Sequence, residues 1–450
     1  MTKGRSLFGT SGIRGSEIEL FTDQFCFDIG RTFSIFLKNH NSEGPVALGM
    51  DPRGSSPRIK NSVASGLVFE GREVFDEGAT PVPSMCYLLK VNDYYAGSIM
   101  VSGSHIKAEL NGIKFFAFGE EILKNHEKEI EEIYRSIKSE RNYKNLSSTS
   151  EVHDDGSAFE EYKNMLLAKA KGPYPNWKVV VDPGDGAQSD TMPYILKALG
   201  VNVIEVHATI QGEFYARDTE HIPDMQELMG NVNKYHADFG IGYDADGDRV
   251  VFVDENGEFI PGDYSGSIIA REEKGSKVVT TISSSQVIDL IGKNITRTKV
   301  GAPYVIEAMK KINARFGFEP NGGSIFKEIM MTRDGGSTTI KFLNILNAKN
   351  KSISKLIAEL PKFYLFKGKI DYKWEQRDQI ESEARRVFKD YKIDGTDGLK
   401  IWVDNTTWIL FRSSLNAPEF RIFAESETEN SAKLLLDRGL NLVKNIVEKV

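Results

Sequence analysis

The sequence predicts an α/β protein in which three repeated mixed α/β domains and a C-terminal α+β domain surround a central cleft. Three observations favour this fold. The chain has 450 residues, which is too many for one ordinary hydrophobic core. Apolar, β-rich runs alternate with helical patterns, and this order occurs three times along the chain. After about Leu365 the order changes, which indicates a domain of another type.

Each repeated unit is expected to begin with a strand, a Gly- or Ser-rich turn and a helix. The first strands are residues 46–52, 179–183 and 278–282, and the second strands are residues 73–75, 203–206 and 295–298. The third strands begin near Ala96, Ala237 and Ala314. Strands separated by helices predict parallel pairing with right-handed crossovers. In such sheets ligands bind beyond the carboxyl ends of the strands, so we expect the loops after the third strands to face one another.

The last domain is predicted to contain a strand at 369–373, a long helix at 376–391, strands at 399–403 and 408–411, a polar loop and a final helix at 427–450. The polar stretch 140–155 is interpreted as a linker, and 254–257 as a turn. These features give predicted domains at 1–152, 153–255, 256–365 and 366–450.

The composition is that of a protein that folds in water, with 40% apolar and 27% charged residues. A net charge of −7 disfavours nucleic acid as a partner, because the phosphate backbone is bound by summed Lys and Arg charge. The first residues contain neither the apolar run of a secretory signal nor a spanning segment, so we expect a cytoplasmic protein without a membrane partner. Cys26 and Cys86 are interpreted as buried free thiols without a chemical role.

The loop after the third strand of the second unit predicts a magnesium site. Asp244, Asp246 and Asp248 alternate just after the apolar run 239–243, so in an extended chain their carboxylates can converge on one cation. An EF-hand is the main alternative, because Glu255 completes its ligand spacing. That motif needs Gly where Arg249 stands and helices where strands are predicted. Solvated surface acids are a further alternative, which like-charge repulsion disfavours.

The corresponding loop of the first unit contains Ser104, followed by His105. A serine in such a loop is usually only a turn residue. Beside a divalent cation, however, a phosphoserine is a sensible phosphoryl donor, because the metal offsets the charge of the phosphate. In the last domain, Arg412 to Asn416 and Arg421 offer guanidinium, hydroxyl and amide donors that could hold a second phosphate, although an ordinary polar loop is equally compatible.

Together these motifs resemble the α-D-phosphohexomutase superfamily, in particular its archaeal-type phosphomannomutase, phosphoglucomutase and phosphoglucosamine mutase members. The resemblance covers nearly the whole chain. It is carried, in order, by residues 8–15, 51–56, 102–105, 111–114, 244–249, 298–301, 319–323, 333–335 and 412–416.

The resemblance implies a mutase that interconverts hexose 6-phosphate and hexose 1-phosphate. Ser104 would carry the phosphoryl group, pass it to the sugar to form a hexose 1,6-bisphosphate, and regain it from the other end after the intermediate turns round. Mg²⁺ would be held by Asp244, Asp246, Asp248 and the Ser104 phosphate, and the bisphosphate would also serve as activator. The implied catalytic residues are Ser104, His105, Lys114, Arg14 and Arg249. The implied substrate-binding residues are Glu319, Asn321, Gly322, Lys299, Arg412, Ser414, Asn416 and Arg421.

The substrate is left open by the sequence. We favour phosphomannomutase/phosphoglucomutase activity, with phosphoglucosamine mutase as the alternative, because one sugar hydroxyl need not discriminate strongly. Two further alternatives are a degenerate sugar-phosphate-binding homologue and a metal-dependent phosphatase that uses the same serine. The chain is expected to act as a monomer or a homo-oligomer on small-molecule hexose phosphates.

Overall fold

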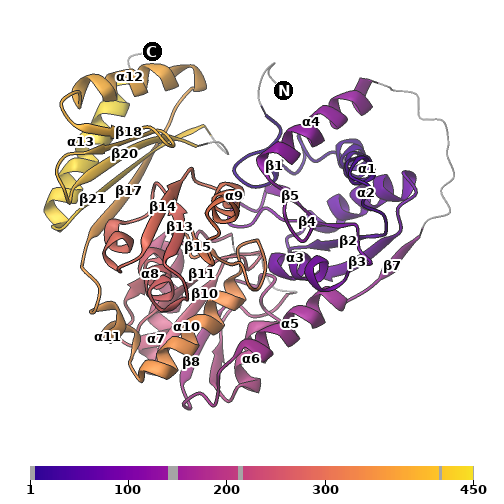
Figure 1. Ribbon diagram of the computed structural model, residues 1–450, viewed down its shortest axis with the longest axis horizontal. Helices are drawn as coiled ribbons and strands as arrows, with labels where there is room; N and C mark the ends of the chain where they lie inside the picture. Colours follow the sequence, from indigo (N-terminus) through magenta and orange to yellow (C-terminus); the bar gives the residue numbers. More distant parts are fainter. Residues whose placement is uncertain (1–5, 140–150, 211–215, 415–417, 449–450) are drawn as a thin grey trace.

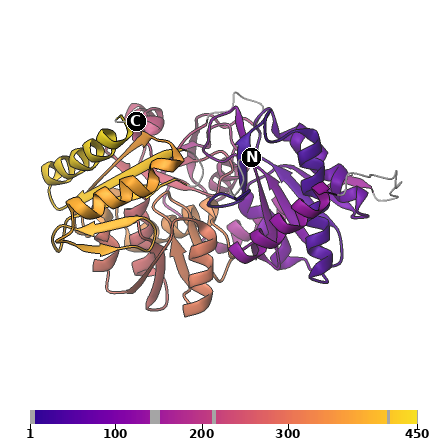
Figure 2. The same ribbon diagram turned by 90° about the horizontal axis from the view of Figure 1, so that it is seen from above.

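The structure is a computed structural model that describes residues 6–139, 151–210, 216–414 and 418–448. Its four parts follow one another along the chain, from indigo to yellow in Figure 1. Figure 2 shows the first part and the last part on opposite sides of the molecule, with the third part between them. No helix among the described residues is long and apolar enough to cross a membrane.

The first part is a seven-stranded sheet with helices packed on it. The strands are β1 (Ile13–Ser16), β2 (Val46–Met50), β3 (Val74–Ala79), β4 (Gly97–Val101), β5 (Leu110–Ala117), β6 (Glu120–Glu121) and β7 (Val152–Asp154). The helices are α1 (Asp23–Asn39), α2 (Ser56–Phe69), α3 (Val82–Val91) and α4 (Lys124–Ser139). Helix α1 begins where the Thr22 side chain accepts the N–H of Phe25, which satisfies an otherwise unpaired donor.

The second part contains β8 (Lys178–Asp182), β9 (Asn202–Glu205), β10 (Phe239–Tyr243), β11 (Val250–Val253), β12 (Phe259–Ile260), α5 (Ser157–Lys169), α6 (Met192–Ala198), η1 (Ile222–Met225) and α7 (Gln226–Tyr235). The third part contains β13 (Lys277–Thr281), β14 (Asn294–Thr298), β15 (Phe316–Phe318), β16 (Ser324–Phe326), α8 (Gly262–Glu272), η2 (Gln286–Leu290), α9 (Ala302–Ile312), α10 (Gly335–Lys349) and α11 (Ile353–Ile357).

The three units share one sheet topology, which confirms the predicted repeat. The spatial orders β5-β4-β2-β3, β11-β10-β8-β9 and β16-β15-β13-β14 are the same arrangement of first, second, third and fourth strand. In each unit the first three strands are parallel, and the fourth runs antiparallel beside the third. The connection from third to fourth strand is therefore a hairpin loop at the carboxyl end of a central strand.

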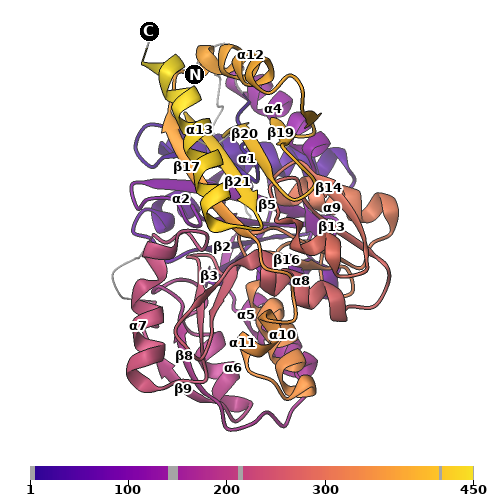
Figure 3. The same cartoon turned by 90° about the vertical axis from the view of Figure 1, so that its left-hand side faces the viewer.

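The last part is an antiparallel sheet in the order β17-β21-β20-β19-β18, which confirms an α+β domain. Its elements are β17 (Tyr364–Asp371), η3 (Trp374–Gln376), α12 (Arg377–Val387), β18 (Lys392–Asp394), β19 (Leu399–Trp402), β20 (Trp408–Ser413), β21 (Glu419–Ser426) and α13 (Glu429–Val447). Figure 3 shows α13 lying along this sheet. The prediction of a polar loop before the final helix was wrong, because Phe420, Ile422 and Ala424 alternate as buried residues of strand β21.

The predicted linker also needs correction at its end. Residues 140–150 lie outside the described part of the chain, but Val152–Asp154 form β7, which pairs in parallel with β3. The first sheet therefore extends past residue 152. The predicted turn at 254–257 joins β11 to β12. The domain boundaries themselves stay predictions.

One hydrophobic core joins the first three parts. It contains Met85 of α3, Val181 of β8 and Phe316 of β15, so these units are packed into a single body. The last domain has its own core, which includes Phe411 and Phe420. A small apolar cluster of Ile282, Trp408 and Leu410 connects it to the third unit. The loops at the carboxyl ends of the strands are thus held in place by extensive packing.

Candidate active site

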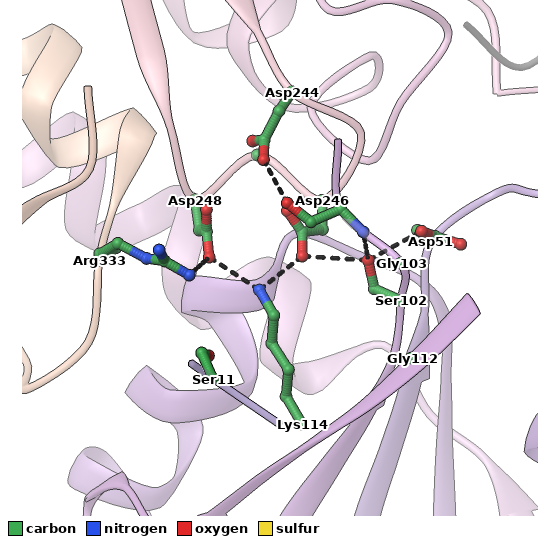
Figure 4. A network of polar contacts seen from close by, with 12 residues as sticks. Ser11, Asp51, Ser102, Gly103, Gly112, Lys114, Asp244, Asp246, Asp248 and Arg333 are labelled. Carbon is green, nitrogen blue, oxygen red and sulfur yellow. Dashed lines mark hydrogen bonds and ion pairs between the residues drawn. The ribbon is translucent and has the colours of Figure 1, made fainter. Parts of the chain in front are cut away.

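The hairpin loops after β4 and β10 contact each other through polar side chains (Figure 4). The loop after β15 is joined to them through Arg333. Residues 102–109 connect β4 to β5, residues 244–249 connect β10 to β11, and residues 319–323 connect β15 to β16. The equivalent position in three repeats therefore carries the serine, the three aspartates and the predicted sugar-binding glutamate.

Ser104 is buried and points at the aspartates. Its Oγ donates to Oδ2 of Asp244 at 2.6 Å, and Nδ1 of His105 lies 3.3 Å from the same Oγ. The backbone of Ser104 has φ = +54°, a left-handed conformation that is unfavourable for a residue with a Cβ. It is held there because its N–H donates to Oγ of Ser102 at 2.8 Å. The loop therefore presents one hydroxyl in a fixed direction.

Arg53 holds the backbone of the Ser104 loop in place through hydrogen bonds. Its Nη2 donates to the carbonyl oxygen of Ser104 at 2.8 Å, and its Nη1 donates to the carbonyl oxygen of Leu110 at 2.5 Å. Asp51 accepts Nε of Arg53 at 2.9 Å. A Cβ at Gly103 would lie 2.3 Å from Nη1 of Arg53, so glycine lets the guanidinium approach the backbone. Arg53 and Asp51 belong to a motif visible in the sequence, but their positioning role is not apparent from it.

The three aspartates converge as expected, but they do so in a turn, whereas the sequence argument assumed an extended chain. The N–H of Gly247 donates to the carbonyl oxygen of Asp244 at 3.1 Å, and Gly247 has φ = +67°. One carboxylate oxygen from each aspartate lies within 4.8 Å of the others. The flanking strands β10 and β11 pair with each other, so the helices that an EF-hand requires are absent at this loop.

Lys114, on β5, lies between two of these carboxylates. Its Nζ donates to Oδ2 of Asp246 at 2.6 Å and to Oδ2 of Asp248 at 2.8 Å. Burial alone would lower the pKa of Lys114, but Asp246 and Asp248 outweigh it and raise that pKa, so the side chain is an ammonium ion. The Oδ1 atoms of Asp246 and Asp248 are buried and have no hydrogen-bond partner among the described residues. Oδ1 of Asp248 lies 3.7 Å from Nε of Arg249, and Oδ1 of Asp246 remains available to a cation.

The charge of the cluster also suits a divalent cation. Burial, followed by the repulsion of Asp246 and Asp248, raises the pKa of Asp244 well above its usual value. Lys114 lies between Asp246 and Asp248, but the raised pKa of Asp244 indicates that the repulsion at this third carboxylate is not offset, and a divalent cation would offset it. All three side chains offer hard oxygen donors, the ligands that Mg²⁺ prefers.

Arg333 joins the aspartate loop, residues 244–249, to the predicted sugar-binding loop, residues 319–323. Its Nη2 donates to Oδ2 of Asp248 at 2.7 Å, and its Nη1 donates to Oε2 of Glu319 at 2.9 Å. Oε1 of Glu319 accepts the N–H of Gly301 at 2.9 Å. Arg333 belongs to a motif seen in the sequence, but sequence reasoning assigned it no role, because its two partners come from other segments of the chain.

Asn321 and Gly322 of the predicted sugar-binding loop contact the second unit, whereas Lys299 lies on a separate loop. The carbonyl oxygen of Asn321 accepts the hydroxyl of Thr219 at 2.7 Å. Gly322 has φ = +86°, and a Cβ there would lie 2.0 Å from the carbonyl oxygen of Val250. Lys299 is exposed, and its Nζ lies 5.8 Å from the ring centre of Tyr304.

Arginines surround the serine. Nη1 of Arg14 donates to the carbonyl oxygen of Gly103 at 2.9 Å. Nε of Arg249 lies 3.7 Å from Oδ2 of Asp244. Burial and then the positive charges of Arg249, Arg14 and Arg421 hold the pKa of His105 well below its usual value, so its imidazole is neutral. Positive charge at this density suits a phosphoryl group.

The predicted phosphate clamp of the last domain is formed by paired strands, and the expectation of a single loop was wrong. Arg412 on β20 stands opposite Arg421 on β21. Nε of Arg412 donates to Oδ2 of Asp397 at 2.6 Å, whereas its Nη2 is buried without a hydrogen-bond partner among the described residues. Ser414 is buried, and its N–H donates to the carbonyl oxygen of Glu419 at 2.9 Å. Asn416 lies outside the described residues.

Comparison with known proteins places the chain in a family. Models of phosphoglucomutase/phosphomannomutase α/β/α domains I, II and III match residues 5–141, 159–257 and 261–364. A phosphoglucomutase/phosphomannomutase of Thermococcus kodakarensis is 37% identical over 98% of this chain and 99% of its own. A protein of Methanopyrus kandleri named as a probable phosphoglucosamine mutase is 32% identical over 98% of this chain and 99% of its own.

The fold has a solved counterpart. The crystal structure of a phosphoglucomutase/phosphomannomutase family protein from Burkholderia thailandensis superposes with a TM-score of 0.83 at 22% identity, over 98% of this chain and 97% of the other. Three repeated α/β units of this topology, matched by the three domain models, define an enzyme of the sugar-phosphate mutase class. The chain belongs to the phosphoglucomutase/phosphomannomutase family. It is a phosphohexomutase, an isomerase, as the sequence predicted.

Proposed function

We propose that this chain interconverts hexose 6-phosphate and hexose 1-phosphate through a phosphoserine at Ser104 and a hexose 1,6-bisphosphate intermediate. The observation that carries the proposal is the contact of 2.6 Å between Oγ of Ser104 and Oδ2 of Asp244, in a buried loop surrounded by arginines. A loop serine that served only to form a turn would not need a hydroxyl aimed at a cluster of three carboxylates.

The cofactor that fits this cluster is Mg²⁺. Asp244, Asp246 and Asp248 would hold it, and the Oδ1 atoms of Asp246 and Asp248, which have no hydrogen-bond partner among the described residues, support this assignment. When bound, the ion would neutralise charge on the transferring phosphoryl group. Lys114 remains in place at the Oδ2 atoms and adds a positive charge next to the same group.

The phosphoryl transfer can be written with these residues. The bond between Oγ of Ser104 and phosphorus breaks while a sugar hydroxyl forms a bond to the same phosphorus and loses its proton. Arg14, Arg249 and Lys114 offset the negative charge of the group in transit. The proton lost by the sugar hydroxyl ends on the departing Oγ of Ser104. Lys114 and Arg14 are the candidates for relaying it, by giving a proton to Oγ and taking one from the hydroxyl. His105, held neutral, lies at 3.3 Å from Oγ and can orient it by a hydrogen bond.

The other end of the sugar phosphate needs a separate binding site. Glu319 and Asn321, with Gly322, would bind sugar hydroxyls, and Lys299 lies on the neighbouring loop. The non-transferring phosphate would be held by Arg412, Ser414, Asn416 and Arg421. The unpaired Nη2 of Arg412 supports this role, because a buried guanidinium donor without a partner suits an anion.

The preferred hexose is proposed from the relatives. The similarity to a protein named phosphoglucomutase/phosphomannomutase supports glucose and mannose phosphates as the substrates of this chain. The similarity to a protein named probable phosphoglucosamine mutase supports glucosamine phosphate as the alternative. Cytoplasmic location, the absence of nucleic-acid partners and the oligomeric state stay predictions.

The test uses the whole protein and two variants. Intact mass of gently purified wild type should show a fraction that carries one phosphoryl group, and Ser104→Ala should lack it. Wild type with Mg²⁺ and glucose 1,6-bisphosphate should convert the 1-phosphates of glucose, mannose or glucosamine, and Ser104→Ala should not. Ser65→Ala, at an exposed position of α2, is the matched control. If Ser104→Ala retains more than a small fraction of wild-type activity, the phosphoryl carrier is another residue.

A further inference from the structure

Asp397 lies in the turn between β18 and β19, and the backbone of this turn packs directly against β20. Gly398 has φ = +81°, and a Cβ there would lie 2.2 Å from the carbonyl oxygen of Phe411 and 3.1 Å from Cα of Arg412. Only glycine allows this approach. The Asp397 carboxylate is therefore held beside Arg412 by the backbone itself.

One oxygen of Asp397 joins the last domain to the third unit. Its Oδ2 accepts Nε of Arg412 at 2.6 Å and also accepts the backbone N–H of Val300 at 3.0 Å. The Arg412 side chain is only 3% exposed, and the Asp397 side chain is 18% exposed. Both contacts are thus largely shielded from water, which strengthens a charge-assisted hydrogen bond.

The contact continues to the sugar-binding loop through one peptide unit. Val300 precedes Gly301, whose N–H donates to Oε1 of Glu319. Gly301 has φ = +132°, and a Cβ there would lie 2.9 Å from the carbonyl oxygen of Thr10 in the first unit. This loop therefore has little freedom to shift.

We propose that Asp397 is a positioning residue of the mutase reaction, and this inference rests on the proposed clamp role of Arg412. Asp397 holds the guanidinium by Nε, so that the two terminal nitrogens of Arg412 face the non-transferring phosphate. It also ties the clamp to the loop that leads to Glu319. An arginine side chain has many rotamers, and ordering it before binding removes that entropic penalty from the binding step.

Charge alone gives the opposite expectation. Asp397 is an anion next to a site for an anion, so its removal would tighten phosphate binding if it acted only through its charge. The hydrogen bonding of Arg412 favours a positioning role for Asp397 instead. Asp397 accepts a hydrogen bond from Nε of Arg412, and Nη2 of Arg412 has no hydrogen-bond partner among the described residues and can therefore donate to a phosphate. The two roles predict changes of opposite sign in the Michaelis constant.

The test compares Asp397→Ala with Asp397→Asn in the whole protein. Asp397→Ala should raise KM for both glucose 1-phosphate and glucose 6-phosphate by about 10- to 100-fold, as expected for loss of one charge-assisted phosphate contact. Turnover at saturation should change less. Asp397→Asn keeps an acceptor oxygen for both donors, so KM should rise less than in Asp397→Ala. Asp390→Ala, at an exposed acid of the same domain, is the control and should leave KM unchanged.

A structural readout separates positioning from a general loss of stability. The N–H of Val300 is bonded to Asp397, so hydrogen–deuterium exchange of a peptide covering residues 298–303 should be faster in Asp397→Ala. The same peptide should keep its protection in Asp397→Asn. If Asp397→Ala fails to fold, the Asn variant still decides, because a KM below that of wild type would show that Asp397 merely competes with phosphate.

Arg412→Ala, measured in parallel, separates this inference from the proposed function. If Arg412→Ala leaves KM unchanged for both substrates, the clamp assignment fails and the role of Asp397 fails with it. If Arg412→Ala raises both KM values and Asp397→Ala does not, the clamp stands and only the positioning role is overturned.

Discussion

Substitution of Asp246 by Asn tests the proposed metal site most directly. Oδ2 of Asp246 is paired with Nζ of Lys114 and lies 3.0 Å from Oγ of Ser102, while Oδ1 has no partner among the described residues. Asn has nearly the same shape, so Asp246→Asn removes one negative charge with little change of volume. The variant also leaves Lys114 with Asp248 as its remaining carboxylate partner in this cluster.

The expected loss follows from the separation of the charges. Two unit charges about 4 Å apart interact by about 4 kcal/mol at the effective dielectric constant of a protein site. The amide oxygen of Asn can still coordinate a cation, and one fewer carboxylate reduces repulsion within the cluster. We therefore expect a net loss of about 2–3 kcal/mol in Mg²⁺ affinity, which corresponds to roughly a 30- to 150-fold higher half-saturating Mg²⁺ concentration.

The assay is the initial rate of glucose 1-phosphate conversion as a function of Mg²⁺, with glucose 1,6-bisphosphate held in excess. Asp190→Asn, at an exposed acid of the same unit, serves as the control and should show the wild-type Mg²⁺ curve. A reduced rate with an unchanged Mg²⁺ curve would refute the reasoning, because the carboxylate would then act on something other than the metal.

Three further predictions follow from other parts of the structure. Arg421→Ala should raise KM about tenfold or more for both the 1-phosphate and the 6-phosphate, and should increase the need for added bisphosphate; equal KM values for variant and wild type would exclude it from the clamp. Arg333→Met should raise both the half-saturating Mg²⁺ concentration and the KM for the sugar phosphate, because the guanidinium contacts Asp248 and Glu319. A change in only one of these two quantities would show that Arg333 does not couple the aspartate loop to Glu319. Burial raises the pKa of Asp263 from 3.8 to about 7, so the folded state loses stability as pH rises from about 4 to 7 and this carboxyl ionises. Asp263→Asn should therefore have a higher melting temperature than wild type at pH 8 but not at pH 4.

The repeated units could be predicted because each strand is an apolar run that ends in small or acidic residues. The runs before Ser104, Asp244 and Glu319 end where the structure ends β4, β10 and β15, with small differences in the boundaries. The apolar runs on both sides of the aspartates likewise predict strands, and β10 and β11 confirm them, which excludes the EF-hand.

Strand β21 was missed although its signal was present. Phe420, Ile422 and Ala424 alternate with polar residues, which is the pattern of a half-buried strand. The polar residues of the nearby segment from Arg412 to Asn416 favour a loop, and the predicted loop extended too far along the chain. As a result Arg421 was assigned to a loop, whereas it lies on a strand opposite Arg412.

Other contacts could not be predicted from one sequence. Arg53, Arg333 and Asp397 contact residues that are distant in the chain or in another unit, so no spacing rule predicts these contacts. The turn of the aspartate loop likewise depends on the positive φ of Gly247, and the local alternation of acids gives no indication of it.

The hairpin topology of the three units bears on how such an enzyme can diverge. Each reactive loop is the tip of two antiparallel strands whose pairing is complete below it. Residues can be exchanged or inserted at one tip without breaking the ladder that supports it. Substitutions in the loop that carries Glu319 can therefore change the sugar that is bound while the loops that carry Ser104 and the aspartates are retained. A new substrate preference would then arise without a change in the residues proposed for phosphoryl transfer.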